Sequence, residues 1–235
     1  MRPTLVIISL FALIVACQSV TERIETYDMQ GIDVSHYQSR VDWDKVAAHD
    51  ISFGFVKATE GESMQDSLFS LNWLRMKEVG IRRGAYHFFR PQVPAIVQAR
   101  NFIRTVSMDY GDLPPVLDIE VSDNTSREDI TKGLKIWLTM IEKHYEIRPI
   151  IYTNLKFYYR YIMGQFDDYP VWIARYNTRP PQLPFGRKWT FWQYGNRGQI
   201  DGIDGPVDFN VFNGTFQDLE ELSLQPRSVF SATEH

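Results

Sequence analysis

Short strand-like segments recur along this chain from residue 31 to residue 212, and helical periods separate the first six of them. These segments are rich in β-branched or aromatic residues and are bounded by Gly, Pro, Asn or Asp, which are typical of turns. We predict eight strands, at 31–36, 51–58, 81–88, 115–120, 149–153, 170–176, 188–194 and 207–212. The alternation strongly limits the possible folds, because strands that alternate with helices favour a parallel sheet covered by helices.

The helical periods predict five helices. We place them around 42–49, 68–80, 95–106, 126–145 and 155–163. The later connections, 177–187 and 195–206, are rich in Pro, Gly and Asn and show no helical period. We therefore expect an α/β fold: a parallel, TIM-barrel-like barrel of eight strands and five helices whose last third lacks helices.

The composition fits one enzyme-sized domain and excludes several classes of protein. The chain has 235 residues, 44% of them hydrophobic and 23% charged, so it is neither wholly disordered nor fibrous. Its net charge is −4, and we expect no nucleic-acid partner because a phosphate backbone requires a cationic surface. A single cysteine excludes an intrachain disulfide framework and a cysteine-based zinc site.

The first residues are typical of a secretory signal peptide. Residues 5–16 form an apolar run after Arg2, too short at about 1.5 Å per residue to span a hydrocarbon core of about 30 Å. Residues 14–17 (IVAC) resemble the lipobox of bacterial lipoproteins, so we predict that Cys17 is lipidated; the alternative is a plain secretory signal. The expected organisation is a signal peptide at 1–16, a polar tether at 17–29, a barrel domain at 30–222 and a tail at 223–235.

Four acidic residues interrupt apolar strands: Asp33, Asp118, Glu120 and Asp208. Burying a carboxylate costs several kcal/mol unless it is paired or hydrogen-bonded, so acids at such positions need a reason. The C-terminal strand ends of a barrel meet at one rim, where barrel enzymes have their active sites. We expect the four side chains to gather at that rim. For an isolated pair of acids, capping a loop or pairing with Arg or Lys would be the simpler explanation.

Asp118 and Glu120 are separated by a single residue. The two-residue period of a strand places both on one face, about 6–7 Å apart at their Cα atoms. Two neighbouring carboxyl groups do not ionise independently, and one tends to keep its proton while the other is charged. A proton donor beside an anion is an arrangement that cleaves glycosidic bonds.

Aromatic and amide side chains follow the same strand ends. Most aromatic residues are expected in the core, but sugar rings stack on aromatic faces and their hydroxyls need hydrogen-bonding partners. Candidates for such contacts are Tyr86, Phe88, Tyr152, Trp172, Trp192, Gln193 and Tyr194.

Other chemistries have little support in the sequence. It contains no G-x-S-x-G, Walker, G-x-G-x-x-G or H-E-x-x-H motif. The five histidines show no metal-ligand spacing, and His36 and His87 are expected to be structural. Asp66 and Asp123 are expected in caps or turns, and the 82–83 arginine pair on a solvated face or beside acids.

Eight sequence blocks follow one another in a specific order. They are 31–38 (GIDVSHYQ), 55–61 (FVKATEG), 84–88 (GAYHF), 115–120 (PVLDIE), 151–153 (IYT), 172–176 (WIARY), 192–194 (WQY) and 207–210 (VDFN). Together they resemble the muramidases of glycoside hydrolase family 25, over about residues 30–215. The resemblance implies a modified (β/α)5(β)3 barrel, without a metal or organic cofactor.

The resemblance also implies an activity and residue roles. The enzyme would be an N-acetylmuramidase (lysozyme) that cuts the β-1,4 bond between N-acetylmuramic acid and N-acetylglucosamine in peptidoglycan. Glu120 would protonate the leaving oxygen, and Asp118 would orient the substrate's own acetamido group in a retaining reaction. Asp33 and Asp208 would hold the charge and hydrogen bonds of the site. Residues implied to line the sugar subsites are Tyr86, Tyr152, Trp172 and Gln193, with Lys57 as a partner of the acids.

Two other functions stay open: a non-catalytic, peptidoglycan-binding lipoprotein, and a hydrolase of chitin-like glycans. We expect peptidoglycan glycan strands as the partner and a monomer whose only membrane contact is its N-terminal lipid. The protein is expected in the cell envelope or secreted. Gln18 is not the Asp associated with inner-membrane retention, which favours the outer membrane.

Overall fold

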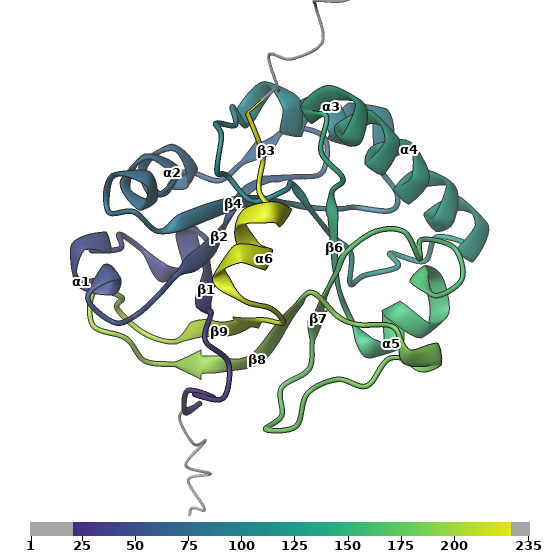
Figure 1. Cartoon of the computed structure of the whole chain (residues 1–235). Coiled ribbons are helices and arrows are strands. Elements are labelled where there is room, and N and C mark those ends of the chain that lie inside the picture. Colours follow the sequence, from purple (N-terminus) through teal and green to yellow (C-terminus); the bar gives the residue numbers. More distant parts are fainter. Residues whose placement is uncertain (1–20, 227–235) are drawn as a thin grey trace, which may run out of the picture.

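The computed structural model describes residues 21–226, which form one barrel with helices on its outside (Figure 1). Its strands are β1 Gln30–Val34, β2 Phe53–Glu60, β3 Met64–Gln65, β4 Arg82–Phe88, β5 Val116–Asp118, β6 Ile150–Asn154, β7 Val171–Ala174, β8 Phe191–Gly198 and β9 Val207–Phe212. Its helices are α1 Trp43–Ala47, α2 Phe69–Glu78, α3 Ala95–Thr105, α4 Arg127–Tyr145, α5 Leu155–Phe157 and α6 Phe216–Leu222. A π-helical turn, Tyr158–Ile162, continues α5. The alternation of strands and helices is thus confirmed.

Eight strands close the barrel in the order β1-β9-β8-β7-β6-β5-β4-β2, and β2 pairs with β1. The one described strand outside the barrel, β3, forms a short hairpin with the end of β2, which the sequence analysis did not predict. The expectation of an entirely parallel barrel is wrong for β9, which is antiparallel to both β1 and β8. The physical reason is the connection 199–206, which contains no helix, whereas a parallel return requires a long crossover.

The reversal of β9 decides where its acid lies. Strand β9 starts at the rim where the other barrel strands end. Asp208 lies near the beginning of β9 and therefore opposite Asp33 of β1. The C-terminal ends of parallel strands and the N-terminal end of a strand antiparallel to them lie at the same rim of a barrel. The four acids therefore gather at one rim as predicted, although Asp208 reaches it from the start of an antiparallel strand and not from the end of a parallel one.

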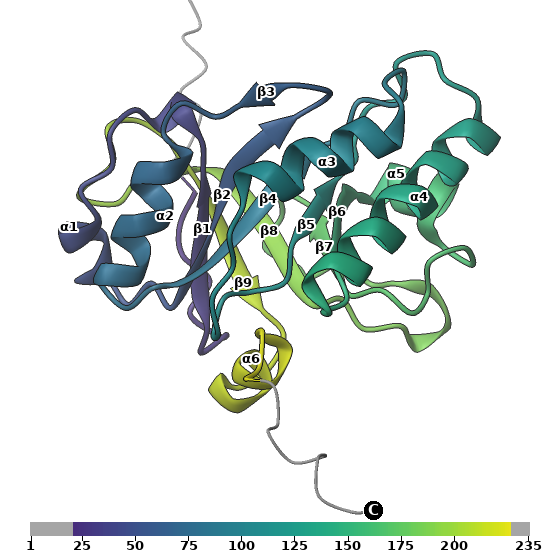
Figure 2. The ribbon, with the colours of Figure 1, turned by 90° about the horizontal axis from the view of Figure 1, so that it is seen from above.

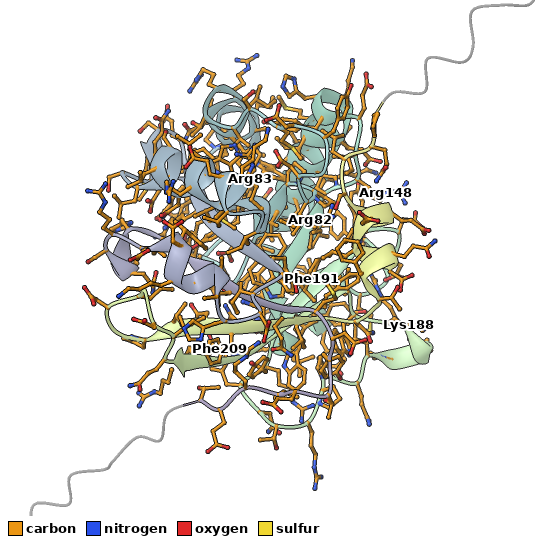
Figure 3. All side chains as sticks on the ribbon, turned by 60° about the vertical axis from the view of Figure 1, so that its left-hand side comes forward. Arg82, Arg83, Arg148, Lys188, Phe191 and Phe209 are labelled. Carbon is orange, nitrogen blue, oxygen red and sulfur yellow. The ribbon has the colours of Figure 1, made fainter. Side chains whose placement is uncertain are left out.

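Large aromatic side chains fill the inside of the barrel. The rings of Phe53, Phe55 and Phe191 contact one another, and Phe191 lies at the centre of the molecule (Figure 3). Glycines make room for them: a Cβ atom on Gly31 would lie 2.3 Å from the ring of Phe53, and one on Gly84 would lie 2.5 Å from that of Phe55. Alternation of large and small residues is how a small barrel is filled to native density.

Helix α6, which the sequence analysis did not predict, covers the barrel end opposite the four acids (Figure 2). Its Leu219 is fully buried in the cluster inside the barrel. At seven residues α6 is too short to show a clear period, although Thr215 and Asp218 form a capping box. The chain stays packed beyond the expected boundary at 222, since the amide of Leu224 donates to the carbonyl of Asp112 at 2.8 Å.

The described part of the expected tether lies against the barrel. The amide of Thr21 donates to the carbonyl of Arg197 at 3.0 Å, and the ring of Tyr27 contacts Trp189 at 5.6 Å between centroids. The side chain of Gln30 donates to two carbonyls of the same segment. Residues 21–29 are therefore part of the folded domain. The predicted signal peptide, Cys17 and residues 227–235 lie outside the described residues, and within residues 21–226 no helix has the length and apolar character needed to cross a membrane.

A buried ion pair joins β4 to the segment before β5. Arg83 donates from Nε to Oδ1 of Asp112 at 2.8 Å and from Nη2 to Oδ2 at 3.1 Å, and its guanidinium lies 4.0 Å from the centre of the Trp73 ring. The two side chains are only 4% and 6% exposed. The prediction of an acid partner for this arginine pair is confirmed for Arg83.

Arg83→Gln should lower the free energy of unfolding by about 3–5 kcal/mol, because it leaves the Asp112 carboxylate buried without its cation. Urea unfolding followed by circular dichroism measures the change. Arg82→Gln is the matched control. It removes hydrogen bonds to the carbonyl of Gly111 and the hydroxyl of Ser223, but the carboxylate that it leaves, Glu220, is 52% exposed and readily hydrated, so the loss should be smaller. Equal losses in the two variants would contradict this account.

Candidate active site

A cavity of about 230 Å³ opens at the C-terminal rim of the barrel, lined by side chains from all eight barrel strands and from loops that follow them. Nine residues expected in the site line this cavity: Asp33, Lys57, Tyr86, Asp118, Glu120, Tyr152, Trp172, Gln193 and Asp208. The expectation of sugar contacts for Trp192 and Tyr194 is wrong, because the strand period places both on the face of β8 opposite Gln193, where they are buried in the hydrophobic core. Ser35, Tyr37, Phe88 and Tyr176 also line the cavity. Of these, Ser35, Tyr37 and Tyr176 were not expected there, although each follows the end of a barrel strand within one to three residues. That position is the signal that could have identified them.

Asp33 is held by neutral donors. Its Oδ2 accepts hydrogen bonds from Nε2 of Gln193 at 2.8 Å and from Nδ2 of Asn210 at 2.7 Å. The Oδ1 atom of Asn210 accepts in turn from Nε1 of Trp172 at 2.8 Å, which orients the amide. Asn210 is fully buried and lies in the last block of the family resemblance, but the sequence analysis assigned it no role.

Two tyrosines orient the second amide of this network. Oε1 of Gln193 accepts from the hydroxyl of Tyr152 at 2.8 Å and from that of Tyr176 at 3.1 Å. The amide nitrogen of Gln193 must therefore face Asp33. Trp172 itself is 2% exposed and stacks on Phe55 at 4.4 Å, so most of its ring belongs to the core and only an edge reaches the cavity.

Asp33 and Asp208 form a carboxyl pair. They face each other across β1 and β9 and share a hydrogen bond. Burial raises the pKa of Asp33 to about 6, although its amide donors oppose the shift. Burial, followed by the charge of Asp33, raises the pKa of Asp208 to about 9. At neutral pH the pair therefore holds one proton, carried by Asp208 and donated to Asp33.

Asp118 and Glu120 form the second pair. Asp118 ends β5 and Glu120 follows two residues later, and both face the cavity as the strand period predicts. Burial, and then the charge of Glu120, raise the pKa of Asp118 well above its ordinary value. Burial also raises the pKa of Glu120, against the charge of Lys57, which lowers it. Among residues 21–226, Oδ1 of Asp118 is buried and has no hydrogen-bond partner.

Lys57 does not pair directly with these acids. Its Nζ donates to Oε2 of Glu60 at 2.6 Å, and its charge acts on Asp118 and Glu120 only through space. Glu60 ends β2, two residues beyond the predicted end of that strand, and the sequence analysis did not single it out. The expected partnership of Lys57 with the acids is thus corrected to an electrostatic influence.

The histidines near the rim are structural, as predicted. His87 is fully buried, with Nδ1 2.7 Å from Oγ1 of Thr59 and Nε2 3.0 Å from Oε1 of Gln98. Burial lowers its pKa to about 4, so the ring is neutral near pH 7 and donates from one nitrogen only. Nδ1 of His36 lies 2.6 Å from Oδ2 of Asp66. The other oxygen of Asp66, Oδ1, accepts from the amide of Leu68 and so caps the turn before α2.

The arrangement offers both proton transfer and charge stabilisation. Two carboxyl pairs with raised pKa values line one cavity, so protonated and ionised carboxyl groups coexist there near neutral pH. Burial also raises the pKa of Tyr86 and Tyr152 well above the usual value, so both keep their phenol protons; Tyr152 donates its proton to Gln193, and Tyr86 can donate its proton to a ligand hydroxyl. Proton donors, an unpaired acceptor and aromatic walls suit a polar ligand with a ring.

Comparisons with known proteins agree on one family. Residues 32–203 match the family model of glycosyl hydrolases family 25. The chain is 48% identical to the uncharacterised protein YegX of Escherichia coli (strain K12) over 200 residues, 83% of this chain and 73% of that protein. It is 36% identical to lysozyme M1 of Streptomyces globisporus over 214 residues, 85% of this chain and 72% of the other.

A solved structure has the same fold. It is a family 25 glycosyl hydrolase from Bacillus anthracis, with a TM-score of 0.81 and 37% identity, and the alignment covers 86% of this chain and 97% of the other. The resemblance inferred from the eight sequence blocks is confirmed, as is the mixed α/β barrel.

Asp208→Asn should make the stability of the protein less dependent on pH. Asp208 keeps its proton up to about pH 9 in the folded state but loses it near pH 4 when unfolded, so its contribution to stability falls as the pH rises between these values. Urea unfolding at pH 5 and pH 8 measures the difference. The wild-type protein should lose more stability between the two than the variant, and an identical loss in both would contradict a protonated Asp208.

Proposed function

This chain belongs to the glycosyl hydrolases of family 25, and we propose that it is an N-acetylmuramidase. The bond cut is the β-1,4 bond between N-acetylmuramic acid and N-acetylglucosamine in peptidoglycan. The similarity to a lysozyme supports the substrate class. The observation that carries the proposal is the pairing of Glu120, a carboxyl of raised pKa, with the unpartnered oxygen of Asp118 in one cavity.

Glu120 is the general acid. It lies in the loop after β5, at the cavity, and is less enclosed than Asp118, so the oxygen of a glycosidic bond can reach it. Burial raises the pKa of Glu120, which favours the protonated form that a general acid requires. Glu120 gives this proton to the leaving oxygen while the bond to the anomeric carbon breaks.

Asp118 orients the substrate's acetamido group. Its buried, unpartnered Oδ1 accepts the acetamido N–H, which turns the acetamido oxygen towards the anomeric carbon. That oxygen attacks, forming a cyclic oxazolinium ion as the leaving group departs, and water then opens the ring while Glu120 takes back a proton. Once Glu120 is protonated, its charge no longer opposes ionisation of Asp118, and Lys57 favours the anion that stabilises the cationic ring.

The remaining polar residues of the cavity hold the sugar and the local charge. Asp33 and Asp208 retain one negative charge near the reacting carbon, fixed by Gln193 and Asn210. Tyr86 donates to a sugar hydroxyl, Tyr152 accepts from one because its own proton is donated to Gln193, and Trp172 and Gln193 complete the wall. The protein acts in the cell envelope as a monomer that a lipid on Cys17 anchors to the outer membrane.

Glu120→Gln should reduce the turnover of purified peptidoglycan about 10²–10⁴-fold, because the variant has no proton to donate to the leaving oxygen. Digestion of peptidoglycan, followed by reduction and mass spectrometry, measures the reaction. The wild-type protein should release muropeptides that end in reduced N-acetylmuramic acid. Binding to peptidoglycan should be retained in the variant.

Three results would contradict the proposal. Products that end in reduced N-acetylglucosamine would identify a glucosaminidase. Faster release from chitin oligomers than from peptidoglycan would indicate a chitin-like substrate. Folded wild-type protein that binds peptidoglycan without releasing products would favour a binding protein.

Removal of substrate N-acetyl groups should stop the reaction almost as fully as Glu120→Gln does. A substrate without the acetamido group has no internal nucleophile, so chemically de-N-acetylated peptidoglycan should be a poor substrate even though the carboxyl groups are intact. Asp118→Ala should remove the preference for the acetylated substrate, since alanine has no acceptor for the acetamido N–H. If the wild-type protein cleaves both substrates equally well, the carboxylate acts directly as a nucleophile instead.

A further inference from the structure

The loop that carries Glu120 is held in an unfavourable backbone conformation. Between β5 and α4, Asp123 and Asn124 have φ angles of 44° and 56°, in the left-handed region that disfavours residues with a Cβ atom. The turn is closed by a hydrogen bond of 2.7 Å from the amide of Thr125 to the carbonyl of Ser122. Asp and Asn tolerate this region better than most residues, but two such residues in succession need support from outside the loop.

We propose that Arg90 is a positioning residue for the general acid, which holds the loop of Glu120 by bridging Glu60 and Asp123. The inference rests on the proposed role of Glu120. Arg90 donates from Nε and Nη2 to Oε1 of Glu60, at 2.8 and 2.5 Å, and its Nη1 lies 3.8 Å from Oδ2 of Asp123. The neighbouring Gln92 donates from its side chain to the carbonyl of Asp123, so the segment after β4 holds the turn at two points.

The arginine is itself fixed to the core of the barrel. Its amide donates to Oε1 of Gln98 at 2.9 Å, and Nε2 of Gln98 donates back to its carbonyl at 2.9 Å. Gln98 is fully buried, and its Oε1 also lies 3.0 Å from Nε2 of His87. The neutral His87 donates this hydrogen bond, so a chain of buried polar groups links β4 to the base of the bridge.

The bridge also sets the charge next to the acids. The ring of Phe88, which lines the cavity, lies 5.2 Å from Nζ of Lys57 and 4.7 Å from the guanidinium carbon of Arg90. Burial alone would raise the pKa of Glu60, but Lys57 and Arg90 outweigh it and lower the pKa. Glu60 is therefore an anion shared between two cations, and loss of Arg90 leaves it to neutralise Lys57 alone. Since Lys57 lowers the pKa of Glu120, that pKa should rise when Arg90 is removed.

The test compares Arg90→Gln, Arg90→Lys and Asp123→Asn with the wild-type protein on peptidoglycan. Arg90→Gln should lower kcat at least about tenfold with little change in KM, since a misplaced acid impairs the chemical step more than binding. Arg90→Lys should recover part of the loss, because a lysine can pair with Glu60 but cannot bridge two carboxylates with a planar fork. The double variant Arg90→Gln/Asp123→Asn should lose little more than Arg90→Gln, because both changes break one bridge.

Arg148→Gln is the matched control. Arg148 joins the carboxylate of Glu142 to the carbonyl of Asp168, and it lies just before the start of β6, at the barrel end opposite the cavity. Thermal unfolding of every variant separates lost stability from lost turnover. A loss of kcat in Arg148→Gln as large as in Arg90→Gln, or an unchanged kcat in Arg90→Gln, would overturn the proposal.

A measurement without substrate separates this inference from the proposed function. The carboxyl ¹³C resonance of Glu120, assigned by its absence in Glu120→Gln, is titrated in the wild-type and Arg90→Gln proteins. An upward shift of its pKa in Arg90→Gln supports the bridge even if the wild-type protein releases no muropeptides. An unchanged titration together with unchanged kcat rejects the bridge while leaving the muramidase assignment intact.

Discussion

Four carboxyl groups gather at one rim of the barrel, where they are largely removed from water. The other polar groups of the site compensate the cost of this desolvation. Asp33 and Asp118 are buried, and Asp208 and Glu120 are only partly open to solvent. Charged forms are unfavourable there unless a donor or a cation compensates them. The compensating groups differ between the two carboxyl pairs, and this difference gives the acids different pKa values.

At the first pair, oriented amides compensate a charge. Gln193 and Asn210 each direct an N–H to Asp33 because their carbonyl oxygens are occupied by tyrosine hydroxyls or by the indole of Trp172. At the second pair compensation is partial: Asp118 has a buried oxygen without a partner, and the nearest compensating cation belongs to Lys57. A site that leaves an acceptor unsatisfied is suited to a ligand that brings the missing donor.

The packing of the barrel makes these positions rigid. Aromatic rings fill the inside, α6 closes the opposite end, and the segment before β1 packs against the outside through Tyr27. Side chains on closely packed strands lose little further freedom when a ligand binds. By contrast, Glu120 lies on a loop, and its position depends on contacts between segments distant in sequence, such as that between Arg90 and Asp123.

The sequence alone encoded eight of the nine described strands, most of the helices and most of the residues that line the cavity. Local period and turn residues encode which side chains share a face, so Asp118 and Glu120 could be placed together, and ordered motifs identified the family. Only the tertiary structure decided the reversal of β9, the pairing of Lys57 with Glu60 and the role of Asn210. These depend on which strands and loops become neighbours, and such contacts between distant residues have no local period that could reveal them.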